Sequence, residues 1–228
     1  FKNDPECWVV ILTGAGDKAF CAGDDIKWAA EHADEPMPWG DWHYSSPTRI
    51  GPTGMLPTEI WKPMIAAVNG YALGGGMEIT LNCDLVVASE NASFGLPEVT
   101  VGVIPGGGGV FRAPRQLPLK VVMYMVMTGE RLSAEEMYRL GYVNKVVPLP
   151  ELLPTATRLA EQICQHPPLG VQAAKESILR GMDLPVDYPA TAWHLFKPSI
   201  TQRLRESEDA QEARQAFIEK RKGRYRGR

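Results

Sequence analysis

The sequence predicts an α/β fold, because patterns typical of buried strands alternate with helical patterns and then give way to helices alone. The run Cys7–Thr13 is continuously apolar, as strands inside a parallel sheet usually are. A second apolar strand, Ile65–Val68, leads through three glycines, Gly74–Gly76, into a helical pattern that begins at Met77. From Glu151 onward only helical patterns remain.

The bulk composition is that of a globular protein. The chain has 228 residues, of which 44% are hydrophobic and 22% are charged, so one large domain or one core with a smaller appendage can bury a sizeable interior. A net charge of −3 gives no reason to expect a nucleic-acid partner. No run of eighteen apolar residues predicts a membrane span, and no signal-peptide pattern opens the sequence.

Neither cysteines nor histidines show the spacing of a metal site. The four cysteines are scattered without a CxxC pair, which favours free thiols in a reducing cytoplasm over disulfides. We therefore expect a cytoplasmic protein without a metal ligand set.

The loop after the first strand resembles the opening of a dinucleotide fingerprint only superficially. Gly14–Ala19 is glycine-rich, but Phe20–Gly23 interrupts the helix that such a site requires. The pair Asp24-Asp25 is instead typical of an N-cap, and it predicts a helix from Ile26.

The stretch Ile65–Leu85 is the strongest candidate for a site. Glycines at a strand-to-helix junction allow close approach of a ligand, and the first N–H groups of the helix can stabilise an anion or a transient oxyanion. Glu78 lies one turn into this helix among apolar residues, so we expect its pKa to be raised. The simpler alternative is a glycine-rich turn with a surface glutamate.

A second glutamate follows the strand Asp84–Ala88. Pro97 precedes Glu98 and stiffens the turn that holds this carboxylate. The glycines Gly106–Gly109 then lead to a helix from Val110. They lack the Lys-Ser/Thr that a phosphate-binding P-loop requires.

The second half of the chain is predicted from local signals. Ser133 and Glu136 form a capping box for a helix that ends near Leu140, with Gly141 as its stop. The other expected elements are a helix over Lys120–Met127, a strand over Asn144–Val147, helices over Glu151–Cys164, Leu169–Arg180 and Asp187–Arg205, and a last helix from Ser207. The basic chain end after it is most simply a solvated charged tail.

The segment Ala33–Pro57 breaks this regularity with many prolines and glycines around Trp39, Trp42 and Tyr44. A long irregular segment of this kind is usually functional. Either it orders over a substrate and sets specificity, or its aromatic side chains anchor a surface loop to the core.

Three blocks of sequence resemble the crotonase (enoyl-CoA hydratase/isomerase) superfamily. They are Lys62–Asp84, Ala19–Ile26 and Phe94–Glu98, and with the C-terminal helices the resemblance covers nearly the whole chain. It implies a spiral of ββα units with a C-terminal helical trimerisation region. We accordingly expect a core over residues 1–147, without the opening strand, helix and strand of the family, and an oligomerisation region over 148–228.

The resemblance implies an enoyl-CoA hydratase that needs no cofactor, since coenzyme A belongs to the substrate. Backbone N–H groups of Asp24, where family members more often carry Ala, and of Gly75 would form an oxyanion hole, and Glu78 and Glu98 would hold one water. Implied substrate or CoA contacts are Ala22, Asp24, Asp25, Ile26, Trp28, Gly74, Gly106, Phe217 and Lys220. Implied partners are an acyl-CoA thioester and further copies of the chain, as a trimer or a dimer of trimers.

Other activities remain open at this point. Met125–Gly129, Ser207–Ala210 and the terminal Gly227-Arg228 are similar to carnitinyl-CoA dehydratases. Those eliminate water from a polar acyl-CoA, and an aromatic cage could bind a cationic group of that kind. An enoyl-CoA isomerase and a catalytically silent acyl-CoA binder are the remaining alternatives.

Overall fold

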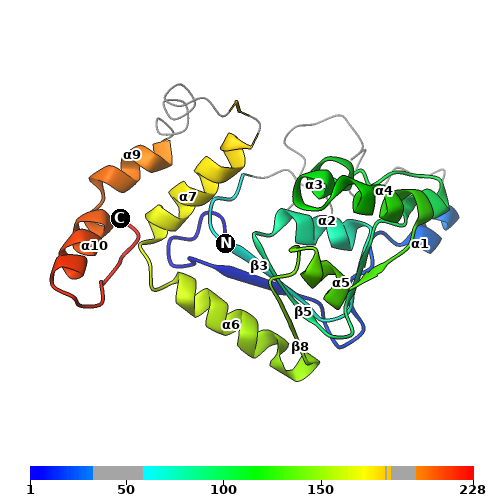
Figure 1. The fold of residues 1–228 in the computed structure, drawn as a ribbon, viewed down its shortest axis with the longest axis horizontal. Helices are drawn as coiled ribbons and strands as arrows, with labels where there is room; N and C mark the ends of the chain where they lie inside the picture. Colours follow the sequence, from blue (N-terminus) through cyan, green and yellow to red (C-terminus); the bar gives the residue numbers. More distant parts are fainter. Residues whose placement is uncertain (33–58, 183, 186–198) are drawn as a thin grey trace. The chain divides into compact units, whose positions relative to one another are not determined.

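The computed structural model describes residues 1–32, 59–182, 184–185 and 199–228. The predicted aromatic segment Ala33–Pro57 lies outside the described residues, as does most of the helix predicted over Asp187–Arg205. Figure 1 shows the described elements in chain order along the ribbon.

In the described part of the chain, eight short strands form two four-stranded sheets. Their order is β1-β3-β5-β8 in one sheet and β2-β4-β6-β7 in the other. The strands are β1 Val10–Thr13, β2 Ala19–Cys21, β3 Met64–Val68, β4 Tyr71–Leu73, β5 Leu85–Ser89, β6 Ser93–Gly95, β7 Leu132–Ser133 and β8 Lys145–Val147. The pairs β2–β4, β3–β5, β4–β6 and β5–β8 are parallel, whereas β6 and β7 pair antiparallel.

Helices follow these strands and then dominate the end of the chain. The α-helices are α1 Ile26–Glu31, α2 Gly75–Asn82, α3 Gly109–Gln116, α4 Leu119–Thr128, α5 Ala134–Arg139, α6 Leu152–Ile163, α7 Pro168–Gly181, α9 Ser199–Glu206 and α10 Glu208–Ile218. The described residues also form the 3-10 helices η1 Glu98–Val101 and η2 Leu149–Glu151.

The order of elements confirms the predicted spiral of ββα units. The first two units read β1-β2-α1 and β3-β4-α2, and each unit adds one strand to each sheet. The third pair, β5 and β6, continues both sheets and leads through η1 to α3 and α4. The α/β class is therefore confirmed, and the elements described from α6 onward are all helices, as expected.

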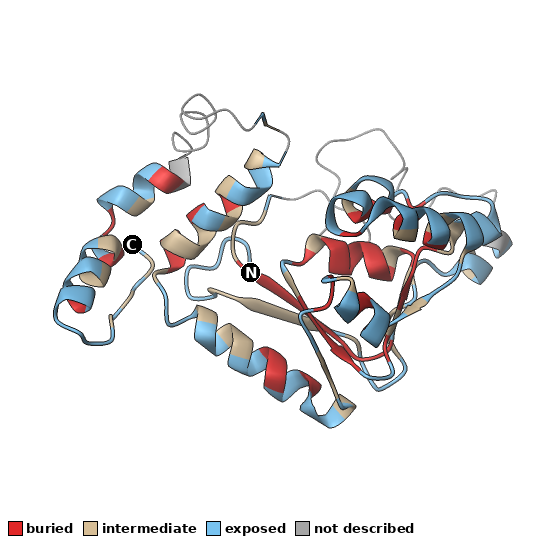
Figure 2. Ribbon diagram, viewed as in Figure 1, coloured by how far each residue is buried: buried red, intermediate tan, exposed pale blue. Residues whose placement is uncertain are grey.

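The core is concentrated on β3, β5 and α2. All five residues of β3 are buried, as expected for a strand inside a parallel sheet, and Figure 2 shows the same concentration. At the end of β3, the buried amide of Asn69 accepts a hydrogen bond from the N–H of Gly14 and donates to the carbonyls of Gly16 and Ala19. This side chain therefore fixes the loop between β1 and β2.

Several element boundaries differ from those predicted. β1 begins at Val10 rather than Cys7, and α2 begins at Gly75, two residues before the predicted start. The strand β4 was not predicted at all. Its three residues form a strand because they pair with β2 on one side and β6 on the other, which is tertiary information.

The chain folds into two compact units. The core unit comprises Ile11–Glu59 and Ile65–Ala156, and the C-terminal unit comprises Phe1–Val10, Ile60–Met64 and Thr157–Arg228. Within the C-terminal unit α7 packs on α9, and α9 contacts α10. The role of the C-terminal helices in trimer formation stays a prediction.

Among the described residues, no helix is both long and apolar enough to cross a membrane. Within the same residues, no group of three His, Cys, Asp or Glu side chains could hold a metal ion.

Candidate active site

Three segments that carry predicted site residues follow the strands β2, β4 and β6, and they leave this sheet at the same edge. β2, β4 and β6 run parallel, with Cys21 opposite Ala72 and Leu73 opposite Gly95. The carboxyl ends of parallel strands meet at one edge of a sheet, where ligand sites of α/β proteins commonly lie. The segments that carry Asp24, Gly75 and Glu98 therefore emerge side by side, although up to 74 positions separate them in the chain.

Two glycine segments cross there at close range. Gly23 and Gly74 both have positive φ angles, +89° and +55°, which side chains disfavour. A Cβ atom on Gly23 would lie 3.2 Å from the carbonyl oxygen of Leu73 and 3.4 Å from the nitrogen of Gly75. Since Gly75 opens α2, its N–H has no acceptor within that helix. The backbones of the two predicted oxyanion donors, Asp24 and Gly75, are thus brought together.

Glu78 is almost fully buried, and its carboxylate faces the start of α3. The N–H of Gly109 donates a hydrogen bond of 2.8 Å to Glu78 Oε1. Burial raises the pKa of Glu78, as predicted, while the N–H groups of Gly109 and Gly107 oppose this shift by stabilising the anion. The positive end of α3 adds to that stabilisation.

Glu98 lies in a different environment at the start of η1. Burial raises the pKa of Glu98 to about 7, its own N–H opposes the shift, and the charges of Glu78 and Asp24 raise it further. Its Oε2 atom is buried and accepts no hydrogen bond from the described residues. A Cβ atom on Gly74 would lie only 3.3 Å from Glu98 Oε1. The second glutamate is therefore placed against the glycine crossing.

A cation also acts on Glu78. Arg112, on α3, lowers the pKa of Glu78, and burial lowers the pKa of its own guanidinium. Its Nη1 atom donates a 3.0 Å hydrogen bond to Asn82 Oδ1 at the end of α2. Arg112 thus links α3 to the end of α2, the helix that carries Glu78.

Sequence reasoning missed part of this arrangement. From the glycine run it named only Gly106, as a substrate contact, whereas Gly107 and Gly109 are the residues whose N–H groups act on Glu78. Gly106 is exposed, and its contact with a substrate stays a prediction. The position of Gly109 as first residue of α3 was the available signal, because the first N–H groups of a helix lack internal acceptors.

The predicted substrate contacts around α1 have defined local roles. Asp25 caps α1 by accepting a 3.0 Å hydrogen bond from the N–H of Trp28, which confirms the predicted cap. The Trp28 ring stacks on His32 with centroids 4.4 Å apart, and Ile26 and Ala22 are exposed. Their contact with a substrate stays a prediction.

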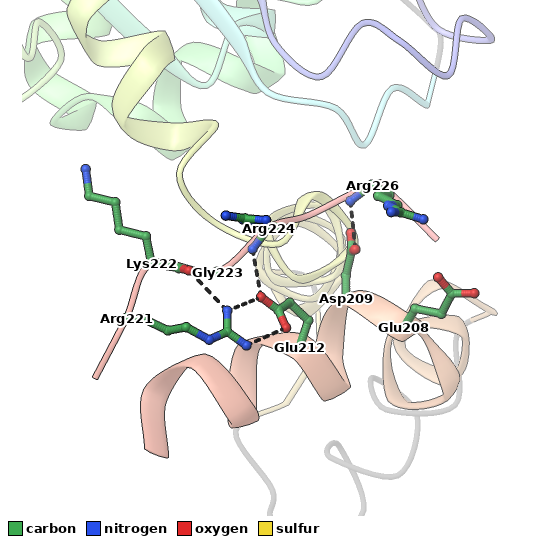
Figure 3. Close-up of a pocket in the computed structure, with 8 residues that line it drawn as sticks. All are labelled: Glu208, Asp209, Glu212, Arg221, Lys222, Gly223, Arg224 and Arg226. Atoms are coloured by element: carbon green, nitrogen blue, oxygen red, sulfur yellow. Dashed lines mark hydrogen bonds and ion pairs between the residues drawn. The ribbon is translucent and has the colours of Figure 1, made fainter. Parts of the chain in front are cut away.

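The basic chain end is more ordered than a solvated tail. Figure 3 shows Arg221 and the N–H of Arg224 converging on the carboxylate of Glu212, and these bonds are 2.5–2.9 Å long. The buried Asp209 accepts from the N–H groups of Arg226 and Gly227 at 2.8 and 2.7 Å. The tail therefore returns along α10.

A polar cleft of about 780 Å³ lies against this tail in the C-terminal unit. It is lined by Glu208, Asp209, Glu212, Arg221, Lys222, Gly223, Arg224 and Arg226. Of the two predicted CoA contacts in this unit, Phe217 is highly exposed at the end of α10 and Lys220 follows with a φ of 54°. Neither lines the cleft, and their CoA contact stays a prediction.

Fold and site together define a class of protein, a spiral of ββα units that holds a buried and a half-buried glutamate beside a glycine crossing. The family model described as enoyl-CoA hydratase/isomerase matches residues 1–228. A carnitinyl-CoA dehydratase of Salmonella enteritidis PT4 is 44% identical over 232 residues, which cover 100% of this chain and 85% of the relative.

Comparison with solved structures gives the same family. An enoyl-CoA hydratase from Mycobacterium marinum superimposes with a TM-score of 0.85 at 37% identity, and one from Bacillus anthracis with 0.84 at 38%. Both matches cover 100% of this chain and 84% of the other. The chain belongs to the enoyl-CoA hydratase/isomerase family, as the resemblance to crotonases predicted, and it is an enzyme of that family acting on acyl-CoA thioesters.

Proposed function

We propose that this enzyme is an enoyl-CoA hydratase, which adds water reversibly across the 2,3 double bond of an enoyl-CoA thioester. The observation that carries the proposal is the unequal pair of glutamates. Glu78 has backbone donors that favour its anion, whereas Glu98 has a pKa of about 7 and a buried oxygen that no described residue engages. Two carboxyl groups with separate pKa values can serve as base and acid in one reaction.

The thioester carbonyl would lie at the glycine crossing. Its oxygen would accept hydrogen bonds from the N–H groups of Asp24 and Gly75, which stabilise the enolate that forms as the β-carbon is attacked. Removal of one donor from such an oxyanion hole costs about 10²–10³ in rate in other enzymes. The close approach of Gly23 to Gly75 supports this role, because side chains there would obstruct the carbonyl.

The two glutamates would then move protons. A water oxygen bonds to the β-carbon while its proton passes to the Glu78 carboxylate, and the protonated Glu98 delivers a proton to the α-carbon. The product is the 3-hydroxyacyl thioester, and transfer of a proton from Glu78 back to Glu98 restores the enzyme. Elimination runs through the same steps in reverse.

Paired amide variants test these roles. Glu98→Gln and Glu78→Gln should each lower kcat for crotonyl-CoA, followed by the loss of enoyl-thioester absorbance, by about 10²–10⁴. Glu130→Gln is the matched control, because Glu130 is an exposed glutamate of the same unit. Near wild-type turnover by a folded Glu98→Gln protein would remove Glu98 from the chemistry.

A dehydratase acting on carnitinyl-CoA is the second candidate, and the 44% identity to relatives of that name supports it. The residues and steps are those above, with elimination as the physiological direction. Comparison of kcat/KM for carnitinyl-CoA and 3-hydroxybutyryl-CoA separates the two candidates. Absence of turnover on both, with binding retained, would instead support a silent acyl-CoA binder.

We further propose that the reaction needs no cofactor beyond the CoA of the substrate, since both proton transfers are assigned to side chains. Dialysis against EDTA should leave kcat unchanged. A loss that added metal restores would contradict this.

A further inference from the structure

The first turn of α3 is joined to α2 by two hydrogen bonds on neighbouring helical turns. The N–H of Gly109 donates to Glu78 Oε1 at 2.8 Å, and Arg112 Nη1 donates to Asn82 Oδ1 at 3.0 Å. Within each helix the two bonded residues are three or four positions apart, so they lie on the same face. The bond from Arg112 to Asn82 is therefore one helical turn away from the Glu78 carboxylate.

The Arg112 side chain also lies against the glycine turn before α3. A Cβ atom on Gly108 would be 3.3 Å from Arg112 Nε, and a Cβ atom on Gly109 would be 3.1 Å from Glu78 Oε1. Arginine and glutamate thus lie against adjacent glycines of one turn. Movement of this turn would redirect the N–H groups of Gly107 and Gly109, which stabilise the ionised Glu78.

The charges around Glu78 give this link an electrostatic side. Asp24 disfavours ionisation of Glu78, and the charges of Glu78 and Glu98 repel each other. Among the described residues, Arg112 is the cation whose charge favours the ionised Glu78 carboxylate. Arg112 is half-buried, so salt and water screen its charge less than they would at the surface.

We propose that Arg112 is a positioning residue for the reaction, which holds the start of α3 against α2 so that the N–H groups there stay directed at Glu78. This inference rests on the proposed function for the role of Glu78 as the base. Arg112 acts through Glu78 and not on the substrate, so its loss should lower kcat for crotonyl-CoA with little change in KM. Because a small misplacement of a reacting group can cost about 10²-fold in rate, Arg112→Gln should lower kcat by about 10–100-fold.

The pH dependence of kcat/KM separates this role from simple support of the fold. Its acid limb reports the lower apparent pKa of the glutamate pair in the free enzyme. Arg112→Gln removes the cation that favours ionised Glu78, so the acid limb should move to higher pH. Arg112→Lys keeps the charge, so its acid limb should stay near the wild-type position.

Two variants of the same helix are the matched controls. Arg115→Gln removes an equal charge from the exposed last turn of α3. Gln116→Ala removes another link to α2, the 2.8 Å hydrogen bond from Gln116 to the carbonyl of Leu81. Neither control should move the acid limb. A folded Arg112→Gln protein with the kcat and acid limb of wild type, or an equal effect of either control, overturns the inference.

Asn82→Ala provides a second test should Arg112→Gln fail to fold, because it removes the acceptor and keeps the arginine. It should also lower kcat, and a folded Asn82→Ala protein with wild-type kcat would contradict the proposed link. A ¹³C NMR titration of the Glu78 carboxyl group, assigned with Glu78→Gln, needs no turnover. It should show a higher pKa for Glu78 in Arg112→Gln than in wild type.

The outcomes separate this inference from the proposed function. Hydration of crotonyl-CoA that depends on both glutamates but not on Arg112 would keep the function and reject the inference. A Glu78 titration that responds to Arg112, in an enzyme that hydrates no thioester, would reject the function and keep the action of Arg112 on Glu78.

Discussion

At the scale of single residues, the site contains two glutamates, Glu78 and Glu98, whose surroundings differ. Burial raises the pKa of both Glu78 and Glu98. Glu78 receives N–H groups from the start of α3, whereas Glu98 faces the charges of Glu78 and Asp24. Differences in hydrogen bonding and neighbouring charge therefore separate the two groups, as expected for a general acid and a general base.

The raised pKa of Glu98 predicts a pH-dependent effect on stability. The folded pKa is about 7 and the ordinary value is 4.5, so between these values the folded state binds more protons than the unfolded state. The stability that Glu98 contributes is present below pH 4.5 and is lost as the pH rises through 7. We expect the unfolding free energy of Glu98→Gln, relative to wild type, to increase from pH 5 to pH 8 by at most about 3 kcal/mol.

Denaturant unfolding at both pH values measures this difference. Because water reaches part of the Glu98 side chain, we expect the change in unfolding free energy to be smaller than about 3 kcal/mol. Glu130→Gln should show the same pH profile as wild type, because Glu130 is exposed. Identical profiles for wild type and Glu98→Gln would show that Glu98 has an ordinary pKa in the folded protein.

At the scale of elements, the start of α2 combines a packing requirement with a binding requirement. A Cβ atom on Gly76 would lie 1.9 Å from the carbonyl oxygen of Cys21, so α2 can pack on β2 only with glycine there. At the neighbouring Gly75 the nearest atom to such a Cβ would be Gly23 Cα at 3.7 Å, an ordinary contact.

Alanine at these two adjacent positions should therefore affect different properties, stability at Gly76 and turnover at Gly75. Gly76→Ala should lower the unfolding free energy by about 1–3 kcal/mol through overpacking. Gly75→Ala should leave stability within about 1 kcal/mol of wild type, because the first residue of a helix tolerates alanine. Gly75→Ala should instead lower kcat for crotonyl-CoA, since the added methyl group would lie at the proposed carbonyl site. Equal stability of the two variants would contradict this account of the packing.

At the scale of the whole molecule, apolar side chains remain exposed where η1, α3 and α4 pack together in the core unit. They are Val99, Val101, Val110, Phe111, Leu119, Met123, Tyr124 and Met127. Exposed apolar side chains in this number on neighbouring elements are typical of a protein that forms an interface. It supports the proposal that copies of this chain associate.

We predict a trimer or a dimer of trimers in solution. Light scattering coupled to gel filtration at micromolar concentration should give about three or six times the chain mass of 25.1 kDa. Met127→Glu, which places a charge among these exposed apolar side chains, should shift the protein toward smaller species. A wild-type mass equal to one chain would refute the prediction.

The sequence alone determined those features that depend on neighbouring residues. The capping box of Ser133 and Glu136 and the N-cap of Asp25 are hydrogen bonds across three positions, so the local pattern was sufficient to predict them. The buried strand β3 was predictable because every residue in it is apolar. The raised pKa of Glu78 followed from its apolar neighbours.

Only the tertiary structure decided the features that join distant segments. The strand β4 is three residues long and carries no local signal, since its conformation depends on β2 and β6. The bond from Gly109 to Glu78 spans 31 positions, and the charge of Asp24 reaches both glutamates only because β2, β4 and β6 end at one edge. The sequence therefore identified the catalytic candidates, while the parallel sheet determined which donors and charges surround them, because such contacts arise only when the strands assemble.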